Sequence, residues 1–487
     1  MPLLKTPLGR YTVYMTKRAL KFISFFSAAF CFLILGVSAL KAQDFNLNGI
    51  SAADISAMDG DKGVVDFTKP GKPEVQGQKE WTIMIFMNSK NNLSQSALFG
   101  LSGNWAQKDL DEMKKVGTTD KVNVVVELGA TGKGSKRILV GKGGLFSSGE
   151  TVYSRDAGAD MGDYKRVIEF VKWSKQTFPS KKYMLILWNH GLGWIDPVMN
   201  RPGAGSADKG ILFDDETRNY VRTRELGEIL RQGGYVDVFA MNACLMQMAE
   251  VAYEVKDNTG LIVASEDTML AYGFDYEKLL NFMNANTGAD SDQISDFFIN
   301  WERQFFAEGA GVGPLHIPLN AVTATISTLR PAALNDLPGY LDAFAGAAMR
   351  NNETEAVKTA IAGVIRFASL DPKNDKKKMI AAYADLYDFA RITGANAKTP
   401  ETRQAAESLM TFIKNRLVIR SLGLNTDTEN GYDYSTVGGI AINMTMKIKT
   451  VPPQLDAFFE TKYGDLALSQ ASQWDEFVAW TDGVWRK

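Results

Sequence analysis

The chain has 487 residues, of which 45% are hydrophobic and 23% charged, a composition typical of globular proteins with two or three packed units. It excludes extended disorder and collagen-like or coiled-coil architecture. Its 54 Lys and Arg nearly balance 56 Asp and Glu, but six of the basic residues and none of the acidic ones lie in the first 42 positions. The remainder is mildly acidic and lacks the basic bias that nucleic-acid binding needs, so we exclude nucleic acid as a partner.

The first 42 residues have the pattern of a secretory signal peptide. A basic stretch ending at Lys21 precedes the apolar run Phe22–Val37, and small residues follow at Ala39 and Ala42. The run is as short as the apolar region of a signal peptide, which favours removal after Ala42 over a permanent membrane span. Cys31 lies inside this run, whereas the anchoring cysteine of a lipoprotein should follow it. We predict export to the periplasm, the cell surface or the extracellular space, with no membrane attachment once the signal is removed.

The exported protein would keep one cysteine, Cys244, and therefore no internal disulfide. Its two histidines are His190 and His316. A lone cysteine is either a buried small hydrophobe or a reactive thiol, and the cysteine count alone favours the first interpretation.

Residues 43–79 are rich in Asp, Gly, Lys and Pro with little periodicity, and we interpret them as a pro-segment or linker. From Glu80 onward, short apolar runs rich in β-branched residues alternate with segments of helical periodicity. The apolar runs are Trp81–Met87, Val122–Leu128, Tyr183–Trp188, Val236–Met241 and Leu261–Ala264. Near-continuous apolar strands are expected when both faces of a sheet are covered.

The segments between these runs predict helices at Gln95–Val116, at Tyr164–Thr177 behind an Asp163 N-cap, at Arg224–Gln232 behind Thr223, and at Leu245–Asp257. Strands that alternate with helices predict an α/β fold, in which a mostly parallel sheet has helices on both faces. Residues 136–142 and 150–154 predict an inserted hairpin. We therefore place the α/β core over residues 80–290.

Residues 291–487 are more helical. Three strand-like stretches recur there, at Val322–Thr328, Val418–Ser421 and Gly438–Met444. These stretches either extend the sheet or build a second unit. We describe this part as a helical C-terminal extension.

Two features that superficially resemble ligand sites lack the residues or the spacing that such sites need. The segment Gly129–Lys136 resembles a phosphate-binding loop, but Ser135 stands where the lysine belongs and the residues that follow predict a strand. The acidic clusters at 109–112 and 214–216 lack the spacing of a calcium loop. Two histidines and one cysteine cannot make a common zinc site without carboxylates. We predict no metal and no cofactor from these patterns.

His190 and Cys244 each follow the end of a predicted strand. His190 follows Tyr183–Trp188 and Cys244 follows Val236–Met241, and the carboxyl ends of parallel strands meet at one edge of a sheet. We expect Cys244 to begin a helix, whose unpaired N–H groups and dipole favour a thiolate. The backbone N–H groups of Gly191 and Cys244 would form an oxyanion hole.

These groups meet the needs of nucleophilic attack on a peptide carbonyl. That reaction requires a thiolate, a proton donor for the leaving amine, and N–H groups that stabilise the oxyanion. The alternative is that His190 is a structural loop residue and Cys244 a packed core residue. Their shared position at strand ends favours the catalytic interpretation. His316 has no comparable position, and we interpret it as structural.

At these residues the chain resembles the clostripain family of cysteine peptidases, in the clan of caspases, legumains and gingipains. The likeness runs from Trp81 to about Tyr276 and continues more weakly to the C-terminus. Its motifs are Trp81–Leu93, Met161–Trp173, Leu187–Trp194, Asn242–Glu254 and Val263–Tyr276. The resemblance implies a caspase-like three-layer α/β/α sandwich, His190 as general acid and base, Cys244 as nucleophile, and a peptide or protein substrate. Calcium dependence is suggested by this resemblance alone.

The chain departs from the family pattern at three positions. Asn242 stands where the family usually has an aspartate associated with preference for Arg or Lys before the scissile bond, and an amide cannot offer the same charge-assisted pairing. Asn189 and Lys90 also stand where aspartate is more usual. Family position and strand-end geometry together suggest that Asn242 shapes the substrate pocket and that Ser265 and Glu266 line the cleft.

Members of the family are often activated by cleavage between the histidine and the cysteine. Here that stretch contains the Gly-rich segment Asn200–Gly210, with Arg201 and Lys209 as candidate cleavage sites of a self-processed zymogen. Two alternatives to a peptidase remain open at this point. One is a non-catalytic relative that binds peptides or a partner, and the other is a thiol amidase or acyltransferase of the same architecture.

Overall fold

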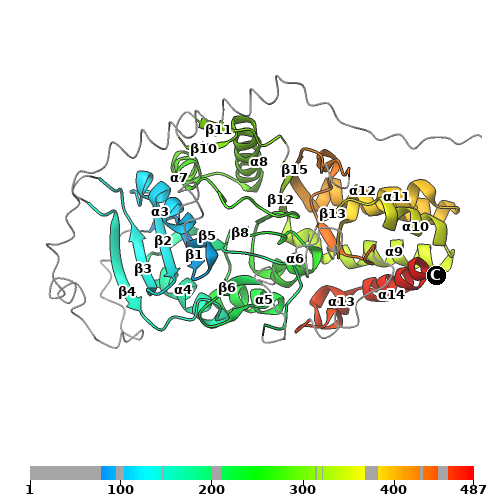
Figure 1. Ribbon diagram of the computed structural model, residues 1–487, viewed down its shortest axis with the longest axis horizontal. Helices are drawn as coiled ribbons and strands as arrows, with labels where there is room; N and C mark the ends of the chain where they lie inside the picture. The colour runs from blue at the N-terminus through cyan, green and yellow to red at the C-terminus, as the bar shows by residue number, and fades with distance from the viewer. Residues whose placement is uncertain are drawn as a thin grey trace, which may run out of the picture. The chain divides into compact units, whose positions relative to one another are not determined.

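Nine of the described strands form one sheet at the centre of the structure (Figure 1). Their order is β15 (Val418–Leu424), β12 (Ala324–Leu329), β9 (Ile262–Ala264), β8 (Val238–Asn242), β5 (Ser180–Trp188), β1 (Lys79–Ser89), β2 (Val122–Ala130), β3 (Gly134–Val140) and β4 (Glu150–Asp156). Strands β2, β1, β5, β8 and β9 run parallel to one another, and strands β3, β4, β12 and β15 join at the margins in antiparallel pairs. The predicted α/β class is confirmed.

The structure is a computed structural model. It describes residues 78–94, 104–144, 147–199, 210–312, 315–320, 322–367, 382–427, 431–447 and 459–487. The predicted signal peptide, the predicted linker up to residue 77, and the candidate processing sites Arg201 and Lys209 lie outside the described residues.

Side chains of the central strands alternate between two apolar clusters, one on each face of the sheet. In β1, Met84 and Phe86 belong to one cluster and Ile83 and Ile85 to the other, and all four are fully buried. Helices α4 (Tyr164–Thr177), α5 (Thr223–Gly233) and α6 (Ala249–Val255) pack on the first face, and α3 (Trp105–Val116), α7 (Tyr276–Ala285) and α8 (Ser291–Glu308) on the second. The result is a three-layer sandwich in which the sheet is buried on both sides.

Helix boundaries agree with the sequence prediction where local signals set them. Helix α4 has the predicted bounds, and the Asp163 side chain accepts a hydrogen bond from the Lys165 N–H as its N-cap. Helix α5 begins at Thr223 itself, with Arg222 as its N-cap residue. The prediction of a helix from Leu245 is wrong, because α6 begins at Ala249.

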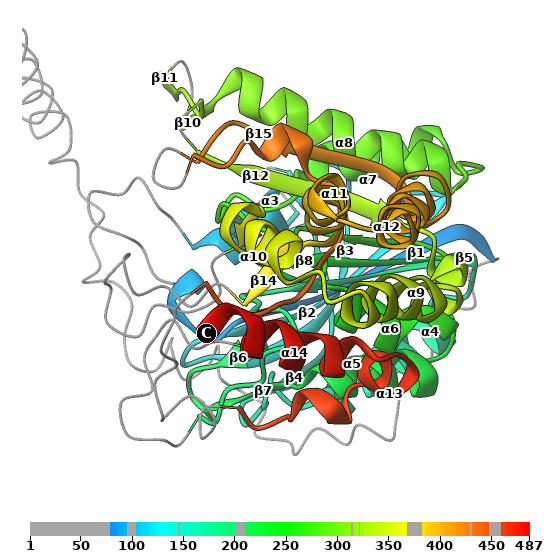
Figure 2. The ribbon, with the colours of Figure 1, turned by 90° about the vertical axis from the view of Figure 1, so that its right-hand side faces the viewer.

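The C-terminal part of the chain contributes to two sheets. Strands β12 and β15 extend the central sheet, whereas β16 (Ala441–Asn443) joins β13 (Arg366–Phe367) and β14 (Tyr383–Asp385) in a separate small sheet. Helices α9 (Leu337–Arg350), α10 (Thr354–Gly363), α11 (Leu386–Asn396), α12 (Pro400–Phe412), α13 (Ala467–Ala471) and α14 (Trp474–Arg486) lie around this small sheet (Figure 2). Their buried side chains continue the apolar cluster beneath α4–α6.

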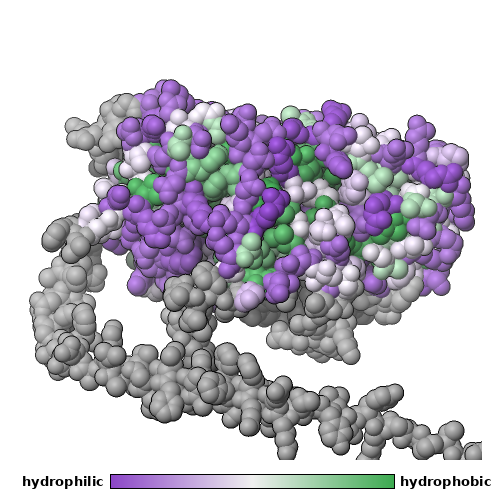
Figure 3. All heavy atoms as spheres, turned by 90° about the horizontal axis from the view of Figure 1, so that it is seen from above, coloured by the Kyte–Doolittle hydropathy of each residue, from purple (hydrophilic) through white to green (hydrophobic). Residues whose placement is uncertain are grey.

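Figure 3 shows a face on which hydrophilic residues surround scattered hydrophobic ones. Within the described ranges, the large hydrophobic side chains classed as exposed are Val152, Tyr153 and Tyr235. No helix in these ranges has the length and apolar character required to cross a membrane.

Candidate active site

The loops that carry His190 and Cys244 lie side by side. Strands β5 and β8 are parallel neighbours, and Trp188 pairs with Asn242 in their register. His190 lies two positions after Trp188, and Cys244 lies two positions after Asn242. Both loops therefore leave the same edge of the sheet. A Cβ atom added at Gly191 would lie 2.3 Å from the carbonyl oxygen of Cys244. The two loops therefore touch, and their close approach requires glycine at position 191.

Cys244 lies in a turn between β8 and α6, not at a helix start. Leu245 adopts a left-handed backbone conformation with φ 62°. Its N–H donates to the carbonyl of Asp267 at 3.0 Å, and the Gln247 N–H donates to the carbonyl of Ser265 at 2.9 Å. This pairing with the loop after β9 keeps residues 245–248 out of a helix. The predicted stabilisation of a thiolate by the start of α6 is therefore wrong.

The surroundings of the thiol favour its protonated form. Cys244 is half-buried, and burial raises the pKa of its thiol above the ordinary value. The Met269 N–H donates to Sγ at 3.2 Å, which opposes this shift without cancelling it. Because its pKa lies above the ordinary value, the Cys244 thiol is neutral at neutral pH.

The His190 imidazole contacts the turn that follows β1. Its Nε2 atom lies 2.9 Å from Oδ1 of Asn92, in the short 3₁₀ turn Asn92–Ser94 that follows β1. With the proton on Nε2, the imidazole donates to the amide oxygen, which can only accept. The sequence analysis did not single out Asn92. The position of β1 beside β5 is the signal that could have found it, since the two strands end at the same edge.

An anion could be stabilised at the junction of the two loops. The Gly191 N–H has no hydrogen-bond partner among the described residues. The Cys244 N–H lies on the facing loop, and the carbonyl of Cys244 lies against Gly191. Thiol, imidazole and two main-chain donors therefore come from neighbouring loops at one edge of the sheet.

Comparison with known proteins identifies the family and the fold. The model of the clostripain family matches residues 86–480. The chain belongs to the clostripain family. It is 26% identical over 250 residues to clostripain of Hathewaya histolytica, a match that covers 43% of this chain and 43% of clostripain. The chain thus matches less than half the length of that curated relative.

Two solved structures share the fold. A secreted C11 cysteine protease from Bacteroides thetaiotaomicron, in complex with an irreversible peptide inhibitor, is 18% identical with a TM-score of 0.55, over 82% of this chain and 100% of that one. An inactive zymogen C11 protease from Parabacteroides distasonis is 17% identical with a TM-score of 0.55, over 82% of this chain and 99% of that one. These neighbours confirm the caspase-like sandwich.

Asn189 connects the histidine loop of this clostripain-family member to the end of β1. Its Nδ2 donates to the carbonyl of Asn88 at 2.6 Å, and its Oδ1 accepts the His190 N–H at 2.6 Å. An aspartate could not supply the first of these bonds, because a carboxylate has no N–H. The unusual asparagine therefore has a structural explanation.

Lys90 has a structural explanation as well. Its buried Nζ lies 3.2 Å from Asp214 and 2.7 Å from Glu216, and it donates to the carbonyl of Ala159 at 2.5 Å. Burial alone would lower the pKa of Lys90, but the two carboxylates raise it above its ordinary value. Lys90 thus links the end of β1 to β6 (Ile211–Asp214), which is the first described strand after residues 200–209.

Asn242 lies at the end of β8 with its side chain 5% exposed. Its Nδ2 donates to the hydroxyl of Tyr276 at 3.3 Å, and Gly273 lies close against its amide. On the same face, Trp188 Nε1 donates to Asp109 at 2.7 Å, and burial raises the pKa of Asp109 well above its usual value. This region therefore contains polar groups from β5, α3 and α7.

Ser265 and Glu266 point into the protein, whereas the sequence prediction had them lining a cleft. They are 0% and 1% exposed. Ser265 Oγ lies 2.9 Å from Thr325 Oγ1, and the Glu266 carboxyl faces that of Asp385. Instead, the main-chain carbonyls of Ser265 and Asp267 accept hydrogen bonds from the loop that contains Cys244.

Other candidate sites lie elsewhere. His316 falls in β11 (Leu315–Ile317), which pairs with β10 (Ala310–Val312). Within the described ranges, no group of three or more His, Cys, Asp or Glu is arranged to hold a metal ion. Calcium remains a suggestion of the family resemblance.

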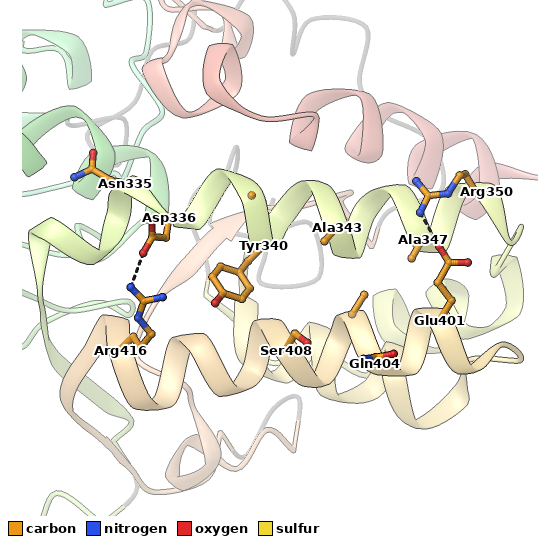
Figure 4. A pocket seen from close by; sticks show the side chains of 12 residues that line it. Asn335, Asp336, Tyr340, Ala343, Ala347, Arg350, Glu401, Gln404, Ser408 and Arg416 are labelled. Carbon is orange, nitrogen blue, oxygen red and sulfur yellow. Dashed lines mark hydrogen bonds and ion pairs between the residues drawn. The ribbon is translucent and has the colours of Figure 1, made fainter.

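A groove of about 740 Å³ lies between α9 and α12 (Figure 4). Small side chains line its middle, and the ion pairs Asp336–Arg416 at 2.5 Å and Arg350–Glu401 at 2.7 Å stand at its two ends. None of the predicted site residues lines it.

Proposed function

We propose that the protein is an exported cysteine endopeptidase that uses Cys244 as nucleophile and His190 as general acid and base, with Asn92 orienting the imidazole. The observation that carries this proposal is the register of β5 and β8, which sends both residues into touching loops. The Asn92–His190 contact supports it, because it orients the imidazole ring beside the loop that follows β5.

The reaction balances with these groups alone. His190 takes the thiol proton as Sγ attacks the substrate carbonyl, and the Gly191 and Cys244 N–H groups stabilise the oxyanion. His190 then gives the proton to the leaving amine, which departs and leaves an acyl-enzyme. Water, deprotonated by His190, hydrolyses the thioester and restores the thiol. A thiol that is neutral at rest fits this sequence, since the proton must pass to histidine when the substrate is in place.

Self-processing between His190 and Cys244 belongs to the same proposal. The Gly-rich composition of residues 200–210 and the candidate residues Arg201 and Lys209 support it, as does the likeness to a protease described as an inactive zymogen. Incubation of the purified chain beside Cys244→Ala tests it. Fragmentation of the wild type alone is expected, and an intact wild type would contradict self-processing.

A peptidyl electrophile and a mixed peptide library test the catalytic proposal. We expect covalent labelling at Cys244, loss of labelling in Cys244→Ala, and cleavage of internal peptide bonds. A protein that is neither labelled nor active would be a binding relative. Labelling with turnover confined to simple amides would indicate an amidase or acyltransferase. Asn242, Asn189 and Lys90 are the departures from the family pattern that favour a non-catalytic relative, and the contacts of Asn189 and Lys90 explain two of them structurally.

A further inference from the structure

The loop after His190 is built around a single tyrosine hydroxyl. Tyr383, fully buried in β14, donates to the carbonyl of Leu192 at 2.5 Å and accepts the N–H of Ile195 at 3.2 Å. Burial raises the pKa of Tyr383 well above its usual value, so the hydroxyl keeps its proton and remains a donor. The hydroxyl thus closes the turn Leu192–Ile195 from both ends.

The loop and the tyrosine ring are sterically matched. Gly193 has φ +63°, and a Cβ atom there would lie 2.7 Å from Cζ and from the hydroxyl oxygen of Tyr383. Glycine is therefore needed at position 193 for two reasons: it allows the positive φ, and a larger residue would overlap the tyrosine ring. Leu192 and Ile195 are 3% and 1% exposed, so solvent water cannot easily replace the hydroxyl.

The turn lies between two anchored points. On one side, Gly191 rests against the carbonyl of Cys244. On the other, Asp196 accepts hydrogen bonds from the Thr223 N–H at 3.1 Å and from Thr461 Oγ1 at 2.6 Å. A change in the turn is therefore expected to move Gly191 and His190.

We propose that Tyr383 is a positioning residue of the active site, whose hydroxyl holds the Leu192–Ile195 turn so that the Gly191 N–H and the His190 imidazole face Cys244. This inference rests on the proposed function of Cys244 and His190. Tyr383 touches no reacting atom and acts only through the loop.

Tyr383→Phe in the full chain tests the proposal, with Tyr434→Phe as a matched control. Tyr434 is also buried, at 4% exposed, and its hydroxyl donates to the carbonyl of Arg366 at 3.3 Å. For Tyr383→Phe we expect kcat on a library-derived peptide to fall about 30-fold with KM changed less than about twofold, because small misplacements of catalytic groups have effects of this order. Tyr434→Phe should stay within about twofold of wild type in both constants.

The two histidines of the chain supply a readout that does not depend on turnover. In protein labelled with ¹⁵N-histidine, Tyr383→Phe should shift and broaden the His190 imidazole signals while those of His316 stay in place. Tyr434→Phe should move neither. Unchanged His190 signals in Tyr383→Phe, or equal losses of kcat in both variants, would overturn the proposal.

Gly193→Ala keeps the test decisive if Tyr383→Phe does not fold. The added methyl group displaces the turn from the opposite side, and we expect the same loss of kcat and the same movement of the His190 signals. A folded Gly193→Ala with wild-type kcat and signals would overturn the proposal. If the wild type cleaves no peptide but Tyr383→Phe still moves the His190 signals, the proposed function fails and the positioning role stands.

Discussion

Asn92 holds the imidazole of His190 through a contact of 2.9 Å between Oδ1 and Nε2, across 98 residues of sequence. We expect Asn92→Ala to lower kcat about tenfold with little change in KM, because the imidazole loses both its orientation and its tautomer preference. Ser94→Ala, in the same 3₁₀ turn, is the matched control and should stay close to wild type. Steady-state kinetics on one peptide would decide, and equal rates for the two variants would refute the orienting role.

Asn92→Asp makes a separate prediction about pH. A carboxylate beside Nε2 stabilises the imidazolium, so the pKa of His190 should rise. A histidine that must be neutral to accept the thiol proton then becomes available only at higher pH. The acidic limb of the kcat/KM profile should therefore shift toward higher pH. A shift toward lower pH, or none, would mean that the imidazole does not face residue 92 during turnover.

The free thiol should ionise late. Burial raises the pKa of the Cys244 thiol. The rate of its alkylation by iodoacetamide should therefore keep rising with pH beyond about 8.5, the usual pKa of cysteine. The inflection in the pH profile of that rate is the measurement. An inflection below pH 7 would instead show that a thiolate and imidazolium pair exists before substrate binds.

Local patterns predicted the parts of this fold that local forces determine. The apolar runs correspond to the buried strands of the parallel centre, and Asp163 with the periodicity after it gave the true bounds of α4. The turn at Cys244 could not be predicted in this way. Helical periodicity continues through residues 245–257, but the N–H groups of Leu245 and Gln247 bind carbonyls about 20 positions later.

The same limit applies to the residues around His190. Its strand-end position is visible in the sequence, whereas its partners come from other strands. Asn92 follows β1, and Tyr383 lies 191 positions beyond Leu192, the residue that it binds. A composition or periodicity signal carries no information about such pairs. The order of the strands at the shared edge of the sheet does carry such information, and it would have indicated residues that follow β1.

Asn242→Asp should create a preference for basic residues. A carboxylate at this position could pair with Arg or Lys before the scissile bond, which the amide cannot do. Burial raises the pKa of Asp109 on the same face, which weakens its opposition to the new charge. We expect kcat/KM for Arg and Lys substrates to rise at least about tenfold relative to wild type, and more at pH 8 than at pH 6. A library profile identical to that of the wild type would show that residue 242 does not contact the substrate.

The buried carboxyls Glu266 and Asp385 should make stability depend on pH. Burial raises the pKa of Asp385 to about 7 and raises that of Glu266 well above its usual value. Both pKa values exceed those of the unfolded chain, so between about pH 4 and pH 7 the folded state binds more protons. The free energy of unfolding should therefore fall as pH rises through this range, by up to about 1.4 kcal/mol per group for each pH unit.

Glu266→Gln should weaken that dependence. The amide cannot ionise, and Asp385, which accepts the N–H groups of Asp388 and Gly438 at 2.6 Å each, could then ionise without a facing carboxyl. At pH 8 we expect the variant to gain about 1–2 kcal/mol in free energy of unfolding over the wild type, and at pH 5 much less. Urea denaturation at both pH values measures this, with Glu308→Gln at an exposed position as the control. A gain of the same size at both pH values would show that the two carboxyls do not share a proton.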